Sequence, residues 1–191
     1  MAGLYFHIPF CKQACHYCDF HFSTNTSSLP RMVAAICKEL ELRKNYLNGE
    51  EIKTIYFGGG TPSLLPIAGL QAIFDSVFQH YKVDPQAEVT LEANPDDLTP
   101  AKIQELKQLP INRLSIGTQS FHGEHLKFMN RAHNSEEALQ SIRNAQLAGF
   151  NNISIDLIYG MPAPDHTLWK QDLEHCSRSC FQSVWSGAGM P

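Results

Sequence analysis

Five short apolar runs constrain the fold of this chain more than any other feature. Each run is rich in β-branched or aromatic residues and predicts a buried strand. The runs are Leu4–Ile8, Thr54–Phe57, Glu88–Leu91, Arg113–Ile116 and Ile153–Leu157. Segments of helical period lie between them, and strands that alternate with helices favour parallel βαβ units. The sequence therefore predicts an α/β fold built on a parallel sheet.

The helical segments have recognisable ends. Helices are expected over Arg31–Lys44, Ile67–Phe78 and Ala101–Gln108. Thr99 is placed to cap the third of these helices, because a hydroxyl before the first turn accepts a free backbone N–H. Asn134 and Glu137 have the spacing of a capping pair, and the helix they open should stop at Gly149.

Composition excludes several classes of protein. The 191 residues suffice for one core, and 15 basic against 19 acidic side chains give a net charge of -4. No basic run favours nucleic acid as a partner, and neither a membrane span nor a signal peptide is apparent. We therefore expect a soluble cytoplasmic protein, where crowded cysteines indicate a metal or catalytic site rather than disulfides.

Unusual residues follow the C-terminal end of each predicted strand. They are Cys11, the glycine segment 58–62, Glu92, Gln119 and Asp156. The carboxyl ends of parallel strands meet at one rim, which is where ligands bind in folds of this kind. We interpret the five groups as parts of one ligand site.

Three cysteines lie on one short loop with the pattern Cys11-x3-Cys15-x2-Cys18. A cuboidal iron–sulfur cluster held by three thiolates leaves one iron open to a small chelating ligand. The alternative is a zinc site completed by His7 or His16, since three cysteines and one histidine are a common zinc set.

The glycine segment 58–62 allows positive φ angles and a close approach of its amides and carbonyls to a ligand. No Lys-Ser/Thr pair follows, so it is not a P-loop. We interpret it as a cradle for an amino acid moiety, although a structural turn would have the same composition.

Glu92, Gln119 and Asp156 stand in apolar strand contexts, where an unpaired buried carboxylate costs several kcal/mol. They therefore need partners, which could be backbone amides or the side chains of Arg113 and Arg131. Arg131 could instead clamp a ligand carboxylate, because a guanidinium presents paired donors.

Together these motifs resemble a known family. Residues 5–20, 58–62, 91–95, 115–121 and 155–160 are similar, in this order, to segments of radical S-adenosylmethionine (SAM) proteins related to oxygen-independent coproporphyrinogen oxidase. The resemblance covers roughly residues 3–172. It implies a partial parallel (β/α) barrel of the radical SAM type.

The resemblance also implies cofactors. Cys11, Cys15 and Cys18 would bind a [4Fe–4S] cluster, whose fourth iron takes the amino and carboxylate groups of SAM. The positions that match the SAM pocket are Tyr5, Gly59, Gly60, Thr61, Glu92, Gln119, Arg131 and Asp156. By the same resemblance, Arg131 would bind the methionine carboxylate, the glycine segment its amine, and Gln119 and Asp156 the ribose.

Two branches of the family differ near the last cluster cysteine. The oxidase branch, which decarboxylates propionate side chains, usually has another cysteine two residues beyond that ligand. Phe20 occupies this position here, which is typical of the branch of heme chaperones that bind heme and deliver it to acceptor proteins. The resemblance therefore implies a heme chaperone, with the oxidase as the alternative and an electron donor protein as a partner.

The C-terminal end departs from the family pattern. The family barrel has six βα units, whereas only five strands are predicted here. We expect residues 1–174 to form an incomplete barrel and residues 175–191 to be an atypical, poorly packed tail outside the family fold. A sixth strand and a downstream domain with a heme-binding motif would then be missing.

Overall fold

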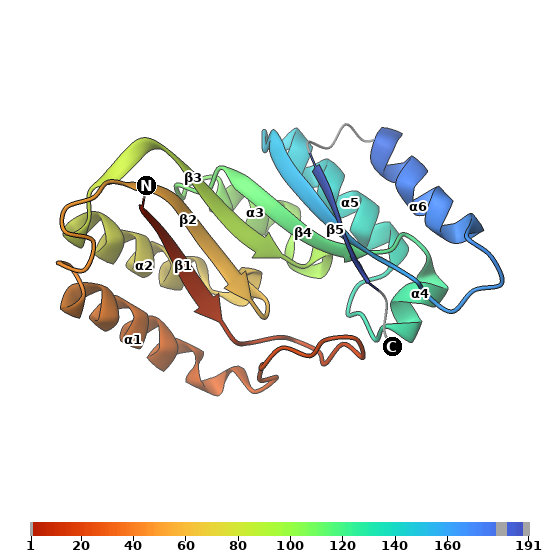
Figure 1. Cartoon of the computed structure of the whole chain (residues 1–191), viewed down its shortest axis with the longest axis horizontal. Coiled ribbons are helices and arrows are strands. Elements are labelled where there is room, and N and C mark those ends of the chain that lie inside the picture. The colour runs from red at the N-terminus through yellow and green to blue at the C-terminus, as the bar shows by residue number, and fades with distance from the viewer. Residues whose placement is uncertain (1, 179–182, 189–191) are drawn as a thin grey trace.

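The protein is built on one parallel sheet (Figure 1). The structure, a computed structural model, describes residues 2–178 and 183–188. The strands are β1 (Ala2–Ile8), β2 (Ile52–Gly59), β3 (Val83–Ala93), β4 (Arg113–Gln119), β5 (Asn152–Tyr159) and β6 (Ser183–Ala188). They lie side by side in chain order, and every neighbouring pair is parallel. The predicted α/β parallel architecture is therefore confirmed.

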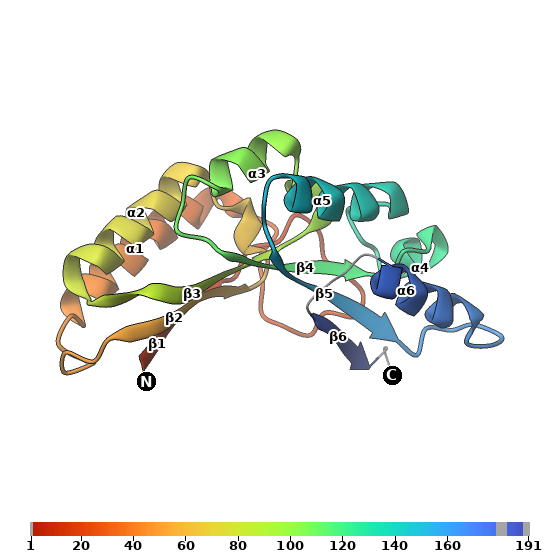
Figure 2. The same ribbon diagram turned by 90° about the horizontal axis from the view of Figure 1, so that it is seen from above.

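Helices cover one face of this sheet. The helices are α1 (Leu29–Leu42), α2 (Ile67–His80), α3 (Pro100–Leu106), α4 (Gly123–Phe128), α5 (Ser135–Leu147) and α6 (Thr167–Arg178). Figure 2 shows the sheet curving beneath α1, α2, α3 and α5, so that its other face is concave. β1 and β6 are its two edges, which makes it a partial barrel. No helix in the described part of the chain has the length and apolar character needed to cross a membrane.

The two faces of the sheet differ in polarity, because successive residues of a strand point to opposite sides. On β4, Leu114 and Ile116 are fully buried in the core beneath the helices. The alternate positions Arg113, Ser115 and Gly117 line a cavity on the concave side. The core therefore lies between the sheet and the helices, and the inside of the barrel is polar.

The predicted helix caps are confirmed. Thr99 Oγ1 accepts the Lys102 N–H at 3.2 Å at the start of α3. Asn134 and Glu137 form a reciprocal capping box at the start of α5. This helix ends at Leu147, and Gly149 follows with a positive φ of 88°.

The expectation of only five strands is wrong. β6 pairs with β5 in parallel register from Ser154–Ser183 to Tyr159–Ala188. The segment that forms β6 lacks an apolar period, so its sequence gives no strand signal. Pairing with β5 depends on backbone groups, which would otherwise remain unpaired at the edge of the sheet.

The expected boundary at residue 174 falls inside a helix. α6 continues to Arg178, and Cys176 is buried in the core. Cys176 is thus packed in the core, whereas His175 and Ser177 on the same helix are exposed. Residues 179–182 and 189–191 lie outside the described residues. That the family fold ends near residue 174 stays a prediction, which limited proteolysis can test.

Candidate cofactor site

One cavity collects most of the residues singled out by the sequence. It has a volume of about 880 Å³ and lies at the C-terminal ends of the strands. Of the predicted site residues, its walls contain Cys11, Cys15, Cys18, Gly59, Gly60, Thr61, Glu92, Gln119, Arg131 and Asp156. The prediction that five strand ends contribute to one rim is therefore confirmed by the geometry.

Tyr5 is the predicted site residue that the cavity wall does not include. Its side chain is 59% exposed, and its hydroxyl is 3.2 Å from Nδ1 of His7. β1 is an edge strand, so the inner face of its middle section opens to solvent. Position on the concave face alone does not bring a residue into the cavity.

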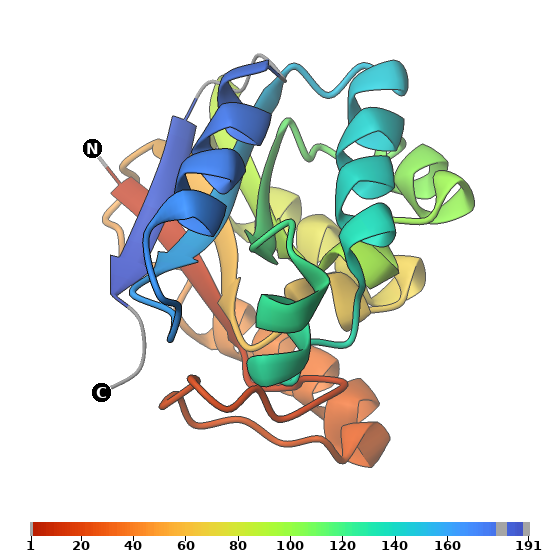
Figure 3. The same ribbon diagram turned by 90° about the vertical axis from the view of Figure 1, so that its right-hand side faces the viewer.

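The cysteine loop follows β1 and lies beside α4 (Figure 3). Gln13 Nε2 donates to Asn130 Oδ1 at 2.6 Å, and Asn130 Nδ2 donates to the Ala14 carbonyl at 2.7 Å. The His16 N–H donates to the Met129 carbonyl at 3.1 Å. These contacts fix the backbone of the loop against the segment after α4. The three cysteines of the loop line the cavity.

The arrangement gives the zinc alternative no support. Nδ1 of His16 donates to the Phe128 carbonyl at 2.9 Å, and Nδ1 of His7 lies against Tyr5. Within the described ranges, no three His, Cys, Asp or Glu side chains are grouped to hold a metal ion. A cubane needs no such grouping, because each of its cysteines binds a different iron.

The three thiols suit a cluster because their surroundings combine partial burial with a positive charge. Burial raises the pKa of the Cys11 thiol, so a free thiolate is disfavoured there without a counter-charge. The Arg131 guanidinium supplies positive charge, with its Nη1 3.3 Å from Cys15 Sγ. Phe20 and Phe22 add apolar surface to the same wall.

The glycine segment packs against the exit of β1. Gly59 has a φ of 110°, and a Cβ on Gly60 would lie 2.7 Å from the Phe10 carbonyl oxygen. The Gly60 N–H donates to Ile8 at 2.8 Å and the Thr61 N–H to Phe10 at 2.7 Å. These amides are already engaged, so the segment can offer carbonyl oxygens rather than N–H groups to a ligand.

Glu92 is held as an acceptor at the end of β3. Its carboxylate accepts the Tyr56 hydroxyl at 2.7 Å and the Gly59 N–H at 3.2 Å. Burial raises its pKa, and these two donors counteract the shift. Tyr56, which was missed in the sequence, is recognisable in retrospect as an aromatic residue on the inward side of β2.

Gln119 ends β4 in an unusual backbone conformation, with a φ of 67°. The next residue, Ser120, donates its hydroxyl to Asp172 at 2.8 Å, and Asp172 also accepts the Phe121 N–H at 2.7 Å. Asp172 is a buried residue of α6. The Asp172 side chain of α6 therefore holds the turn that presents Gln119, a role that no sequence motif indicates.

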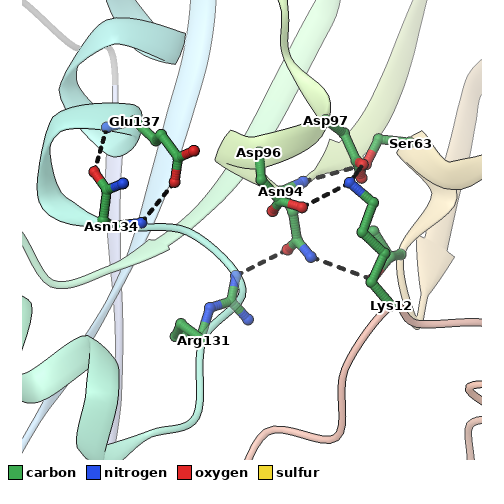
Figure 4. A network of polar contacts seen from close by, with 9 residues as sticks. Lys12, Ser63, Asn94, Asp96, Asp97, Arg131, Asn134 and Glu137 are labelled. Carbon is green, nitrogen blue, oxygen red and sulfur yellow. Dashed lines mark hydrogen bonds and ion pairs between the residues drawn. The ribbon is translucent and has the colours of Figure 1, made fainter.

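Arg131 lies at the centre of the rim (Figure 4). Its Nη2 donates to Asn94 Oδ1 at 2.8 Å and to the Gly117 carbonyl at 2.7 Å. Its Nη1 donates to the Tyr17 hydroxyl at 2.9 Å as well as to Cys15. Nε is buried without a partner among the described residues.

Figure 4 also shows ion pairs that fix the cysteine loop to the turn following β3. Lys12, next to Cys11, pairs with Asp96 at 2.7 Å and with Asp97. Asp97 also accepts the Ser63 hydroxyl at 2.5 Å. The turn 94–97 was assigned no chemistry from the sequence, because its Asn-Pro-Asp composition is that of an ordinary turn.

Replacing Lys12 with Met is expected to lower the free energy of unfolding by roughly 3 kcal/mol, because two nearly buried carboxylates would lose their counter-charge. Urea unfolding of the protein without cofactors measures the change. The matched control is Lys38→Met, which breaks a surface pair with Glu41 and should cost at most about 1 kcal/mol. Equal effects of the two substitutions would contradict this role of Lys12.

Asp156 lies on β5 at the inner wall of the cavity. Burial and the nearby Glu92 carboxylate raise its pKa to about 6. Arg113, one of the partners that the sequence suggested, is too far away for an ion pair but lowers this pKa by its charge. Asp156 therefore changes between its charged and neutral forms near pH 6, well above the usual range of an aspartate.

The fold and the rim together define a class of protein. It is an open parallel (β/α) barrel with a three-cysteine loop and a polar cavity at the carboxyl ends of its strands. The family model of the radical SAM superfamily matches residues 5–170. The chain belongs to the radical SAM superfamily.

Curated relatives place the chain within this superfamily. It is 37% identical to the heme chaperone HemW of Synechocystis over 179 residues, which cover 90% of this chain and 43% of that protein. HemW of Escherichia coli is 37% identical over 84% of this chain and 43% of its own length. A mitochondrial radical SAM domain-containing protein of Danio rerio is 31% identical over 96% of this chain and 41% of its own length. The chain thus spans less than half the length of these relatives.

Solved structures agree with the fold. Coproporphyrinogen III oxidase (HemN) from Escherichia coli superposes with a TM-score of 0.88 at 26% identity, covering 99% of this chain and 44% of that chain. Methylornithine synthase (PylB) superposes with a TM-score of 0.67 at 11% identity, covering 99% of this chain and 53% of that chain, and shares the fold alone.

Proposed function

We propose that this protein binds a [4Fe–4S] cluster through Cys11, Cys15 and Cys18 and binds SAM in the adjoining cavity. The observation that supports this most directly is the convergence of the three thiols, Arg131 and the glycine segment on one cavity. When bound, the cluster and SAM supply reductive cleavage of the SAM sulfonium, the chemistry typical of the superfamily.

The residues of the rim match the functional groups of SAM. Arg131 lines the cavity and is the candidate for the methionine carboxylate, because a guanidinium suits a carboxylate. Carbonyl oxygens of the glycine segment can accept from the amine, since their amides are engaged. Gln119 and Asp156 face the cavity as candidates for the ribose hydroxyls, with Glu92 beside them. Tyr5 stays a proposed member of this set, without an assigned role.

We propose further that the protein is a heme chaperone that binds heme and passes it to acceptor proteins. Two observations support the chaperone over the oxidase. Identity is 37% to the HemW proteins named above, against 26% to the oxidase. Phe20 replaces the cysteine usual in the oxidase branch, and its 70% exposed ring at the cavity wall suits an apolar macrocycle.

An anaerobic assay that offers heme and coproporphyrinogen III in parallel tests this proposal. The chaperone function predicts a change in the heme absorption spectrum on binding and no release of carbon dioxide from coproporphyrinogen III. Carbon dioxide release that depends on SAM and a reductant would favour the oxidase instead. The cytoplasm, with an electron donor protein, is the proposed setting, because a reducing compartment keeps cysteine thiols free.

A further inference from the structure

A second polar layer lies below the rim, on the inner face of the sheet. Arg113 on β4 stands in register with Thr90 on β3. One step nearer the rim, Ser115 stands in register with Ser154 on β5. Arg113, Ser115 and Ser154 all line the lower part of the cavity that also contains Asp156.

These side chains form a chain of hydrogen bonds that runs from Arg113 through Ser154 to Ser115. Arg113 Nη2 donates to Ser154 Oγ at 2.8 Å, and Ser154 Oγ lies 3.1 Å from Ser115 Oγ, to which it donates. A side-chain hydrogen bond from Ser115 then favours the charged form of Asp156.

The donors of these hydrogen bonds can be arranged in only one direction. A guanidinium has donors and no acceptor, so the Ser154 oxygen must accept from Arg113. The Ser154 hydrogen is then directed at Ser115, and the Ser115 hydrogen is left for the carboxylate. Each donor therefore points toward Asp156, and an ionised carboxylate is a stronger acceptor for it than a neutral carboxyl group.

Burial strengthens the hydrogen bonds between these side chains. Ser115 and Ser154 are both buried, so their hydroxyls exchange little with water. Arg113 forms no ion pair within the described part of the chain, and its hydrogen-bond partners there are the hydroxyls of Thr90 and Ser154. Arg113 therefore acts on Asp156 by its charge across the cavity and through the hydrogen bonds of the two serines, without forming an ion pair with it.

We propose that Arg113, acting through Ser154 and Ser115, positions Asp156 as an acceptor for the ribose hydroxyls of SAM. This inference rests on the proposed SAM site. Two adjacent ribose hydroxyls can both donate, and an ionised carboxylate, which only accepts, is complementary to them. Arg113 is thus a positioning residue for the cofactor, although it lies below the rim.

Several other charged or titratable groups face Asp156. Glu92 on β3 raises the pKa of Asp156, whereas Arg113 on β4 and Arg131 after α4 lower it. Tyr56 on β2 hydrogen-bonds Glu92 and lies within the electrostatic range of Asp156. With a pKa of about 6, Asp156 is mostly ionised at neutral pH, so SAM affinity should fall as the pH drops through this value. Loss of the serine chain should move this fall to higher pH.

The test is Ser154→Ala, measured without and with cofactors. In the protein without cofactors, an NMR titration of the side-chain carboxyl carbon of Asp156 should show a higher pKa than in the unmodified protein. In the reconstituted protein, a rise of this pKa from about 6 to about 7 should raise the dissociation constant for SAM about twofold at pH 7 and about fivefold at pH 6, in proportion to the ionised fraction that is lost. In an Asp156→Asn background, the same change should have no further effect.

Thr90→Val is the matched control. It removes the other hydroxyl that contacts Arg113, from an equally buried position that lies off the path to Asp156. It should leave both the Asp156 pKa and the SAM affinity unchanged. An unchanged Asp156 pKa in Ser154→Ala, or an equal shift in Thr90→Val, would overturn the inference whether or not SAM binds. Failure of the unmodified protein to bind SAM would overturn the proposed function as well.

Discussion

Replacing Cys15 with Ala is expected to abolish cluster assembly. Anaerobic reconstitution of the unmodified protein should give about four irons per chain and a broad visible absorption, whereas Cys15→Ala should retain almost no iron. The physical reason is that each of the three thiolates binds a different iron of the cubane, so the loss of one leaves that iron without its protein ligand. Iron analysis and absorption spectroscopy measure the loss.

Cys37→Ala is the control for this experiment. Cys37 is a free, half-buried cysteine of α1, away from the loop, where its thiol donates to the Ala72 carbonyl at 3.5 Å. It should keep the full iron content, so that a general effect of losing a thiol can be separated from the loss of a ligand. Stoichiometric zinc without iron in the unmodified, anaerobically purified protein would support a structural zinc site and contradict the cluster.

Replacing Arg131 with Ala is expected to weaken SAM binding by roughly 2–5 kcal/mol, at least about thirtyfold in the dissociation constant. The substitution removes the guanidinium proposed for the methionine carboxylate. It also frees Asn94 and the Gly117 carbonyl, which shape the same wall. Calorimetric titration of the reconstituted protein with SAM measures the change.

The contact between Arg131 and Cys15 requires that the cluster be checked first. Iron content and the electron paramagnetic resonance spectrum of the reduced variant show whether the cluster has assembled before affinities are compared. Arg143→Ala, which removes an exposed guanidinium from α5, should leave SAM affinity unchanged. Unchanged affinity in Arg131→Ala would remove this residue from the pocket and leave it a structural link between Asn94 and the cysteine loop.

The polar network around Lys12 gives the cysteine loop a second attachment. On one side, Gln13 and Ala14 are bound to Asn130. On the other side, Lys12 is bound to Asp96 and Asp97. A loop attached on both sides loses less conformational entropy when it binds a cluster, because part of its order is already present in the fold.

The sequence alone determined the order of the elements and the cysteine loop that we propose as the cluster site. Strands β1 to β5 follow from apolar runs, and the caps at Thr99 and Asn134 follow from local hydrogen-bonding chemistry. Cys11, Cys15 and Cys18 are recognisable because their spacing is a local property of the chain. Signals of this kind need no knowledge of which segments meet in space.

The tertiary structure decided what depends on contacts between distant segments. β6 is formed by backbone pairing with β5, and no side-chain pattern in the sequence predicts it. Tyr5 matches the pocket in sequence but lies on an exposed edge strand, whereas Tyr56, one strand further in, reaches Glu92. Arg113 and Asp156 are 43 residues apart in the sequence, and only the register of β4 and β5 connects them through two serines. Strand pairing fixes these neighbours, because it sets which inward-facing residues share a row across the sheet.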